Sequence, residues 1–458
     1  MSDVILDAWD GAAVPLHALT EAQAAAALDA DAFAAGLART AEFRGKAGQL
    51  LAVPNAEGAV GRVLFGVGDG RNEAVFRALP AKLPAGVYRI AEAPEEVTAE
   101  RIALAFALGS YRFDRYKARD GEEPRLLIEG CDLSEVRQVA HACALARDMV
   151  NTPANDMGPR QIETIAREIG EQFAAQVAVI EGEGLIEANY PAIHAVGRAA
   201  DPSRAPRFIE IRWGDPGRPL VCVVGKGVVF DTGGLDIKPS AGMRLMKKDM
   251  GGAAHALALG RMIMAAGLPV SLAVLVPVVE NAISGDAMRP GDVIDSRKGL
   301  TIEVGNTDAE GRLILADALT RAAELEPALT IDMATLTGAA RIALGPQLPP
   351  FYTEDDELAA QIEAAAKAES DPLWRMPLWK PYAEALDSDI ADIKNDPDGW
   401  AQAGSVTAAL FLQRFAPQGP WVHLDIFAWN PKGRPGWPAG GEVQAVRGLY
   451  RMIRERFA

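Results

Sequence analysis

The chain has 458 residues, of which 49% are hydrophobic and 24% charged, and its formal net charge is −16. This length is enough for two or three domains with large buried cores, and the composition is ordinary for a soluble globular protein. The negative charge repels phosphate backbones and therefore disfavours nucleic-acid binding through overall electrostatics, which leaves only a local basic patch as an alternative.

The N-terminus and the apolar runs predict a cytoplasmic protein without a membrane anchor. Residues 1–10 are acidic and mixed and lack the basic stretch and apolar core of a secretory signal. Even the apolar run 270–279 ends far short of the ~18 residues that a membrane helix needs. The cysteines Cys131, Cys143 and Cys222 are odd in number and lie in apolar runs, so we expect reduced thiols packed as small core residues.

Short strands alternate with helices in the first 150 residues. The Ala-rich segment 22–27 favours a helix over a flexible linker. The hydrophobic pattern predicts strands at 50–53, 62–66, 87–90 and 125–128 and helices at 98–108 and 133–150. Pro153, Gly158 and Pro159 then interrupt the chain, because they cannot continue the preceding helix. We therefore expect a small N-terminal α/β domain over residues 1–150.

The same alternation continues on a larger scale from residue 151 to residue 458. It predicts helices at 160–173, 251–266, 312–325 and 406–415, and strands at 177–180, 207–211, 220–224, 270–279, 329–335 and 422–427. Strands that alternate with helices form mostly parallel sheets covered by those helices. The predicted fold class is therefore α/β, with a small N-terminal domain and a larger C-terminal domain.

Carboxylates follow three apolar runs at the points where strands are predicted to end. Asp231 precedes Thr-Gly-Gly, Asp249 precedes Met-Gly-Gly, and Asp308 and Glu310 lie within Asn-Thr-Asp-Ala-Glu-Gly-Arg at 306–312. Lys226 lies between two glycines in the first of these runs. Open α/β sheets place their ligand sites beyond the carboxyl ends of the strands. We therefore expect these acids and Lys226 to form one site.

The ligand types present indicate which metals this site would suit. Clustered carboxylates favour hard or borderline divalent ions such as Mg, Mn, Zn or Co. Bridging carboxylates hold paired ions about 3.5 to 4 Å apart. The five histidines are scattered and no His-Glu-x-x-His occurs, which excludes a helix-borne histidine zinc site.

Each of these residues also has an explanation without a function. Asp231 could form a turn, Asp249 could cap a helix, and Asp308 and Glu310 could favour the dipole of a first helical turn. Lys226 and Lys238 could be solvated loop residues. Gly-Lys-Gly at 225–227 is a weak phosphate-loop signal, because it lacks the spacer and the ending of a P-loop. Together these explanations are improbable, so the pattern favours a site.

The motif series resembles the leucyl aminopeptidase family, the di-metal cytosol aminopeptidases. The order and spacing match over about residues 145–426, and Asn-Thr-Asp-Ala-Glu-Gly-Arg is a strong family signature. The first 145 residues resemble the family's N-terminal domain only in size and α/β character. The matching segments are 147–159, 226–234, 237–243, 246–252, 289–292, 306–313 and 332–339.

The resemblance implies a role for each matching residue. Asp231 and Glu310 would bridge two ions, Lys226 as a neutral amine and Asp249 would complete one ion, and Asp308 would complete the other. The two divalent ions would be Zn or Mn, with Mg or Co as alternatives. Lys238 and Arg312 would be catalytic: Lys238 would stabilise the oxyanion, and Arg312 would hold a bicarbonate that accepts a proton from the activated water. The residues expected to bind the peptide substrate are Met246, Asn306, Ala309, Thr335, Leu336, Gly338 and Phe427.

Two segments depart from the family pattern. The family has Asp-Ile followed by Ala-Gly on the last strand, whereas this chain has Asp425, Ile426 and then Phe427. Strand alternation points Phe427 towards the pocket, so its ring should shorten the pocket and favour N-terminal residues smaller than leucine or phenylalanine. In the alternative, Phe427 packs into the core and the following loop reopens the pocket. Residues 438–442 only loosely resemble the family's Gly-rich turn.

The function expected from the resemblance is removal of N-terminal residues from peptides by a homohexamer with active sites facing an inner cavity. Two alternatives remain. Some bacterial relatives double as DNA-binding regulators, which the charge of −16 argues against. A catalytically inactive peptide-binding member would normally have lost a ligand or the arginine, and all seven metal-binding and catalytic positions are intact here.

Overall fold

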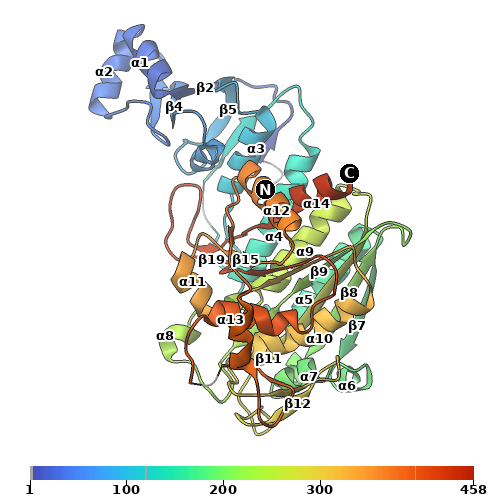
Figure 1. The fold of residues 1–458 in the computed structure, drawn as a ribbon. Coiled ribbons are helices and arrows are strands. Elements are labelled where there is room, and N and C mark those ends of the chain that lie inside the picture. The colour runs from blue at the N-terminus through green and yellow to red at the C-terminus, as the bar shows by residue number, and fades with distance from the viewer. Residues whose placement is uncertain (1–3, 119–120, 398) are drawn as a thin grey trace. The chain divides into compact units, whose positions relative to one another are not determined.

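The computed structural model describes residues 4–118, 121–397 and 399–458, and Figure 1 traces the chain. The chain folds into two compact units. The first contains residues 1–144 and 432–439, and the second contains residues 145–431 and 440–458. Each unit is built on a sheet of its own.

The first unit has a six-stranded sheet with the order β1-β6-β5-β2-β4-β3. Strands β3 and β4 pair antiparallel, and the other neighbours pair parallel. The core of the unit includes Phe65, Phe76 and Phe106. The strands are β1 (Ile5–Leu6), β2 (Val14–Thr20), β3 (Leu50–Pro54), β4 (Val60–Gly68), β5 (Gly86–Glu92) and β6 (Pro124–Leu127), and the helices are α1 (Glu21–Asp29), α2 (Ala32–Thr40), η2 (Glu73–Ala78), α3 (Ala99–Gly109) and the start of α4 (Ser134–Asn151).

The sequence pattern missed one central strand of this sheet. Strand β2 lies between β4 and β5, although Pro15 lies inside it. A proline within a run argues against a central strand, because it cannot donate a ladder hydrogen bond. Only pairing with strands more than 40 residues away reveals β2, with Leu16 opposite Val63 on one side and Ile90 on the other.

The second unit has a nine-stranded sheet with the order β16-β15-β18-β14-β9-β11-β8-β7, and β10 pairs with β11. The central strands β18, β14, β9 and β11 run parallel, which confirms the predicted sheet type. On one side of this centre β8 pairs antiparallel with β11 and with β7, and on the other side β15 pairs antiparallel with β18. The strands are β7 (Gln176–Glu181), β8 (Arg207–Trp213), β9 (Leu220–Gly225), β10 (Gly227–Asp231), β11 (Ser271–Asn281), β14 (Leu329–Ala334), β15 (Pro350–Tyr352), β16 (Trp374–Arg375) and β18 (Trp421–Asp425).

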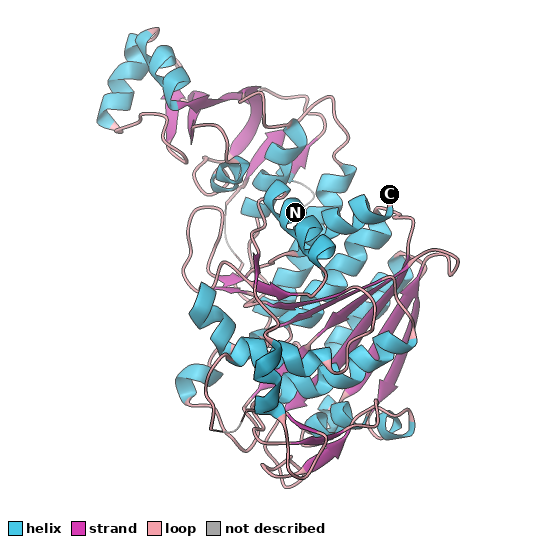
Figure 2. Ribbon diagram, in the orientation of Figure 1, coloured by secondary structure: helices cyan, strands magenta, loops and turns pink. Residues whose placement is uncertain are grey.

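Helices cover both faces of this sheet, as Figure 2 shows in cyan against the magenta strands. Helix α9 packs on β9, β11 and β14 and contacts α14, whereas α7 and α10 pack on the sheet and on each other. Every residue of β14 and β18 is therefore buried. The helices are α5 (Pro159–Gln172), α6 (Gly184–Glu187), α7 (Pro191–Gly197), η3 (Pro202–Arg204), α8 (Ser240–Met243), η4 (Met246–Lys248), α9 (Gly251–Ala265), α10 (Glu310–Glu324), α11 (Gly338–Leu344), α12 (Asp356–Ala368), η5 (Lys380–Leu386), α13 (Gly404–Gln413) and α14 (Val446–Phe457).

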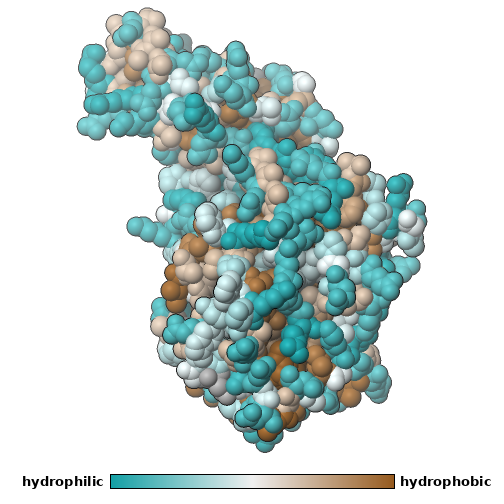
Figure 3. All heavy atoms as spheres, viewed as in Figure 1, coloured by the Kyte–Doolittle hydropathy of each residue, from teal (hydrophilic) through white to brown (hydrophobic). Residues whose placement is uncertain are grey.

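Two small sheets lie outside the main one in the second unit. Strands β12 (Val293–Asp295), β13 (Thr301–Glu303) and β17 (Ile393–Lys394) form one, and β19 (Trp429–Asn430) and β20 (Gly440–Gly441) form the other. In Figure 3, hydrophilic side chains cover most of the visible face, with separate apolar patches. Within the described ranges, no helix has the length and apolarity to cross a bilayer.

Glycine allows the close packing that brings strand ends and helix starts together. A Cβ on Gly252 would lie 2.1 Å from the carbonyl oxygen of Met333, so only glycine lets α9 begin against the end of β14. A Cβ on Gly311 would lie 2.5 Å from Cε of Lys226. The first turn of α10 therefore touches the lysine side chain at the end of β9.

Candidate active site

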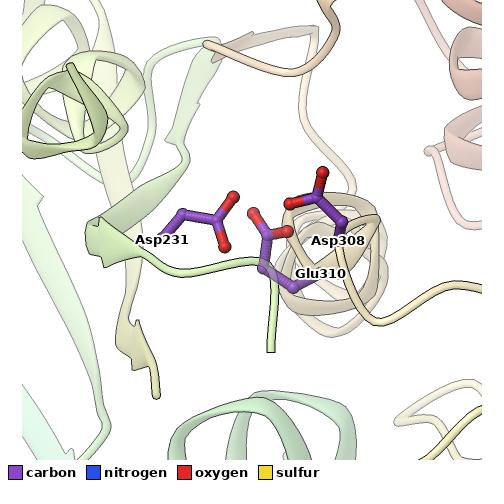
Figure 4. Close-up of side chains that lie close together, drawn as sticks. All are labelled: Asp231, Asp308 and Glu310. Atoms are coloured by element: carbon purple, nitrogen blue, oxygen red, sulfur yellow. The ribbon is translucent and has the colours of Figure 1, made fainter. Parts of the chain in front are cut away.

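The four predicted acids come from three places near the carboxyl ends of the parallel strands. Asp231 is the last residue of β10, Asp249 follows η4, and Asp308 precedes α10, which begins at Glu310. Carboxylate oxygens of Asp231, Asp308 and Glu310 lie within 4.8 Å of one another. Figure 4 shows these three carboxylates pointing toward one another. Such an arrangement of like charges is unfavourable without cations between them.

Asp231 is fixed by one of its two oxygens. Its Oδ1 accepts hydrogen bonds from the backbone N–H of Gly233 at 2.9 Å and from Nδ2 of Asn281 at 2.8 Å. Its Oδ2 faces Nζ of Lys238 at 2.7 Å. Asp231 therefore does form the turn that its sequence context suggests, but with one oxygen only. Asn281, at the end of β11, is a supporting residue that the sequence did not reveal.

Asp249 does not cap helix α9, whose first residues have no side-chain cap. Its Oδ1 accepts from the hydroxyl of Thr335 at 2.9 Å, and its Oδ2 lies 2.7 Å from Nζ of Lys226. The side chain of Asp249 is almost fully buried. The capping explanation is therefore wrong, and both oxygens of Asp249 face the site.

Lys226 is buried among acids rather than solvated. Its Nζ lies 3.0 Å from Oε1 of Glu310 and donates to the carbonyl oxygen of Thr335 at 3.2 Å, in addition to its contact with Asp249. Burial lowers the pKa of Lys226, but the surrounding carboxylates, led by Asp249 and Glu310, raise it above its ordinary value overall. Without metal the lysine is therefore an ammonium, and it would have to lose its proton before its Nζ could bind a metal ion.

Glu310 has a carboxylate oxygen that no donor among the described residues satisfies. Its Oε2 is buried and has no hydrogen-bond partner among the described residues. Burial and the charge of Asp231 raise the pKa of Glu310. A buried carboxylate oxygen without a partner is costly, whereas a metal ion would satisfy it. Four carboxylates and one amine are a suitable donor set for a pair of hard or borderline divalent ions.

Lys238 lies at the rim of this cluster, in the loop between β10 and α8. Its Nζ contacts Asp231 and Asp308, and 15% of its side chain is exposed. Hydrogen bonds between Thr307 and Asp236 fix this loop against the segment before α10, with the Thr307 N–H donating to Asp236 at 2.8 Å. Lys238 is therefore positioned at the open side of the acids.

Arg312 is buried in the first turn of α10. One of its Nη atoms donates to the carbonyl oxygen of Asn395 at 2.6 Å, whereas its Nε has no hydrogen-bond partner in the described part of the chain. Asn395 also accepts from the N–H groups of Gly305 and Asn306 at 2.8 and 3.2 Å. Asn395 thus holds Arg312 and the signature segment together, and no motif in the sequence pointed to it.

One cavity of about 690 Å³ contains every site residue that the sequence predicted. It is lined by Lys226, Asp231, Lys238, Met246, Asp249, Asn306, Asp308, Ala309, Glu310, Arg312, Thr335, Leu336, Gly338 and Phe427. The structure therefore brings these residues together, although they come from widely separated segments of the chain.

The cavity also has lining residues that the sequence analysis did not single out, notably Lys248, Thr337 and Arg341. In the sequence, only the position of Lys248 next to Asp249 could have indicated that it belongs to the site. Burial lowers the pKa of Lys248 to about 8. Thr337 is fixed by Asp425, whose carboxylate accepts from both its N–H and its hydroxyl, at 3.1 and 2.6 Å.

Phe427 lies just beyond β18 and lines the cavity. Its backbone N–H donates to Oε1 of Gln444 at 3.0 Å. Gln444 in turn donates its own N–H to Nε2 of His255, which is buried in α9. Phe427 thus does not pack away into the core, and buried polar groups hold its backbone in place.

Comparisons with known proteins agree with this geometry. The family described as "Cytosol aminopeptidase family, catalytic domain" matches residues 144–450, and the family described as "M17 aminopeptidase, N-terminal domain" matches residues 14–129. A "Probable cytosol aminopeptidase" of Syntrophotalea carbinolica is 44% identical over 76% of this chain and 73% of its own length. Another, from Rhizobium meliloti, is 38% identical over 97% of this chain and 96% of its own length.

Solved structures show the same fold. The crystal structure of cytosol aminopeptidase from Coxiella burnetii has a TM-score of 0.94 and 44% identity, and the match covers all of both chains. The bottromycin maturation enzyme BotP in complex with Mn has a TM-score of 0.86 and 35% identity, with 98% of this chain and 100% of that chain covered.

Proposed function

We propose a two-metal mechanism for this chain, which belongs to the cytosol aminopeptidase family and is a metallo-aminopeptidase of the leucyl type. In the proposed reaction the enzyme hydrolyses the first peptide bond of a peptide and releases its N-terminal residue. The observation that supports the metal site most directly is the buried Glu310 Oε2, which has no partner among the described residues and lies among other acids.

Five residues would hold the ions. Asp231 and Glu310 would bridge them, Lys226 and Asp249 would complete one, and Asp308 would complete the other. We propose Zn or Mn as the native ions, with Mg or Co as alternatives. The solved relative BotP is described in complex with Mn. When bound, a pair of divalent ions lowers the pKa of water towards neutrality and polarises the peptide carbonyl.

Lys238 would act on the peptide carbonyl. Its ammonium lies at the open side of the acids, where it contacts Asp231 and Asp308. Burial lowers the pKa of Lys238, but Asp231 and Glu310 raise it above the ordinary value overall, so the side chain remains a hydrogen-bond donor. Donation to the carbonyl oxygen would stabilise the negative charge that develops there during attack by water.

Arg312 would hold an anion beside the reacting water. Its buried Nε lacks a partner among the described residues, and a planar guanidinium matches the geometry of a carbonate group. We propose bicarbonate as this anion, which supplies a proton acceptor where no histidine is among the described residues that line the cavity. Asn395 would keep the guanidinium in place through its carbonyl oxygen.

We also propose a cytoplasmic homohexamer with peptide substrates. Light scattering of the purified protein would measure the mass of the assembly directly, and any mass other than six chains would contradict the assembly proposed.

The proposed function is tested by metal analysis together with hydrolysis of aminoacyl p-nitroanilides. Protein stripped with a chelator should lose activity, and titration with Mn or Zn should restore it with two ions bound per chain. Full activity with fewer than two ions per chain would rule out the two-metal mechanism. Full activity of the stripped protein would rule out metal dependence altogether.

A further inference from the structure

Lys248 differs from the other two lysines of the site. The ammonium groups of Lys226 and Lys238 each contact two carboxylates. Lys248 is only 6% exposed and lines the same cavity, yet no described carboxylate forms an ion pair with it. Its Nζ instead lies 4.8 Å from the centroid of the Phe427 ring.

A second cation lies at the same ring. The guanidinium carbon of Arg341, on the exposed side of α11, is 5.4 Å from the ring centroid of Phe427. Like Lys248, Arg341 lines the cavity and forms no ion pair within the described ranges. The aromatic ring that departs from the family pattern is therefore accompanied by two cations that form no direct ion pair with a described carboxylate.

The positive charges of Lys248 and Arg341 are not neutralised by a direct ion pair within the described residues. Cation–π attraction is weaker than the loss of hydration that a buried ammonium suffers, so the ring alone does not compensate Lys248. Of the carboxylates whose charges act on Lys248, Asp249 is a proposed metal ligand, and Asp425 already accepts hydrogen bonds from Thr337 and Ser405. A carboxylate brought by the ligand would complete the pocket through charge-assisted hydrogen bonds.

We propose that this pocket binds the side-chain carboxylate of an acidic N-terminal residue, aspartate or glutamate, between Lys248 and Arg341 on the ring of Phe427. The inference rests on the proposed aminopeptidase function and specifies its substrate class. Phe427 occupies the position expected to contact the side chain of the N-terminal residue. Its backbone N–H donates to Gln444, which fixes the backbone of the residue whose ring lines the cavity.

The test compares charged and neutral side chains of nearly equal shape. We would measure kcat/KM of the Mn-loaded enzyme for the p-nitroanilides of Glu, Gln, Asp, Asn, Ala and Leu. These substrates have no C-terminal carboxylate, so any preference for Glu over Gln reports the side chain. We expect Glu to exceed Gln, and Asp to exceed Asn, by about tenfold or more, as for a charge-assisted hydrogen bond.

Substitution identifies the cations responsible. Lys248→Met should lower the Glu-to-Gln ratio by about tenfold, and Arg341→Met should lower it less, because Arg341 is exposed and screened by solvent. Lys247→Met is the matched control. The neighbouring Lys247 donates to the carbonyl oxygen of Asn151 and does not line the cavity, so the ratio should not change. Lys248→Arg keeps the positive charge, so the Glu-to-Gln ratio should stay above one. This variant tests the role of the charge if Lys248→Met does not fold.

A binding measurement separates recognition from turnover. Free glutamate should raise the unfolding temperature of the enzyme more than glutamine at equal concentration, and Lys248→Met should remove the difference. Equal rates for Glu and Gln p-nitroanilides, with Ala or Leu cleaved normally, would overturn the acidic pocket and leave the proposed function intact. Faster cleavage of dipeptides than of the matching p-nitroanilides, with no preference for Glu over Gln in either series, would assign the cations to a C-terminal carboxylate and would also overturn it. Absence of hydrolysis of all six substrates would overturn both.

Discussion

Helix α10 carries two buried carboxylates that behave in opposite ways. Asp317 accepts hydrogen bonds from the backbone N–H groups of Ala192 and Ile193, at 2.9 and 3.1 Å, and from that of Arg297 at 2.7 Å. Glu310, seven positions earlier, has one oxygen without a partner among the described residues and faces other carboxylates. Both side chains are almost completely buried.

The difference distinguishes a structural acid from a functional one. Two of the three N–H groups around Asp317 belong to the first turn of α7, and the third belongs to the loop at Arg297. The Asp317 carboxylate therefore joins α10, α7 and that loop. Both oxygens of Asp317 are satisfied within the folded chain. Glu310 leaves its acceptor capacity unused, which is unfavourable for the metal-free chain and useful for holding an ion.

The largest expected effect is at Glu310. Glu310→Gln should lower the metal content below two ions per chain and abolish hydrolysis, because an amide is a poor bridging ligand. The stability of the metal-free protein should change little, since the substitution removes both the repulsion from Asp231 and the ion pair with Lys226, and these two effects oppose each other. Asp317→Asn is the control: it should keep both ions but destabilise the fold by about 1 to 3 kcal/mol, because its NH₂ group would face backbone donors. Metal analysis and thermal unfolding measure both. If Glu310→Gln kept two ions per chain and normal rates, the distinction between Glu310 as a metal ligand and Asp317 as a structural acid would be wrong.

The next effect is at Lys238, which contacts the acids but is not proposed as a ligand. Lys238→Ala should keep two ions per chain and lose roughly 2.7 to 4 kcal/mol of transition-state stabilisation, as loss of one oxyanion donor does. The loss should appear in kcat for Ala p-nitroanilide. Loss of metal from this variant would show that Lys238 is a ligand instead.

A third effect concerns His255, a buried histidine in the core of the second unit whose two ring nitrogens both have partners. His255 lies within hydrogen-bond distance of the Gly251 carbonyl oxygen and accepts from the Gln444 N–H, and burial lowers its pKa to about 4. The unfolded chain takes up this proton near pH 6.5, whereas the folded chain does so only near pH 4. The free energy of unfolding should therefore fall by about 3 kcal/mol as the pH decreases through this window. Denaturant titrations of the wild type and His255→Gln measure it, and equal pH slopes would contradict the assignment.

The smallest effect concerns the size of the pocket at Phe427. Its ring should disfavour bulky aliphatic and aromatic N-terminal residues by about 1 to 3 kcal/mol, the usual cost of overpacking. In Phe427→Ala the rates for Leu and Phe p-nitroanilides should rise relative to Ala. A wild-type preference for Leu of about tenfold or more, unchanged in Phe427→Ala, would show that the ring does not limit the pocket.

Much of the fold followed from local patterns. The alternation of strands and helices predicted the α/β class and the parallel centre of the large sheet, because both are encoded in segments of about ten residues. Strand β2 was missed since Pro15 argues against a central strand, and the antiparallel direction of the strands at the sides was missed because it depends on distant pairing. The assignment to the aminopeptidase family is confirmed by the matching family and structures.

The sequence by itself determined which groups could do the chemistry: carboxylates at strand ends, a glycine-flanked Lys226 and the signature segment that contains Asp308, Glu310 and Arg312. Only the tertiary structure decided which of these groups lack partners. It showed that Asp249 is not a helix cap, that Asn281 and Asn395 support the site, and that Lys248 contacts the Phe427 ring and forms no direct ion pair among the described residues. The reason is physical: a residue type fixes how many hydrogen bonds and charges a side chain offers, whereas the folded chain fixes how many of them are already satisfied.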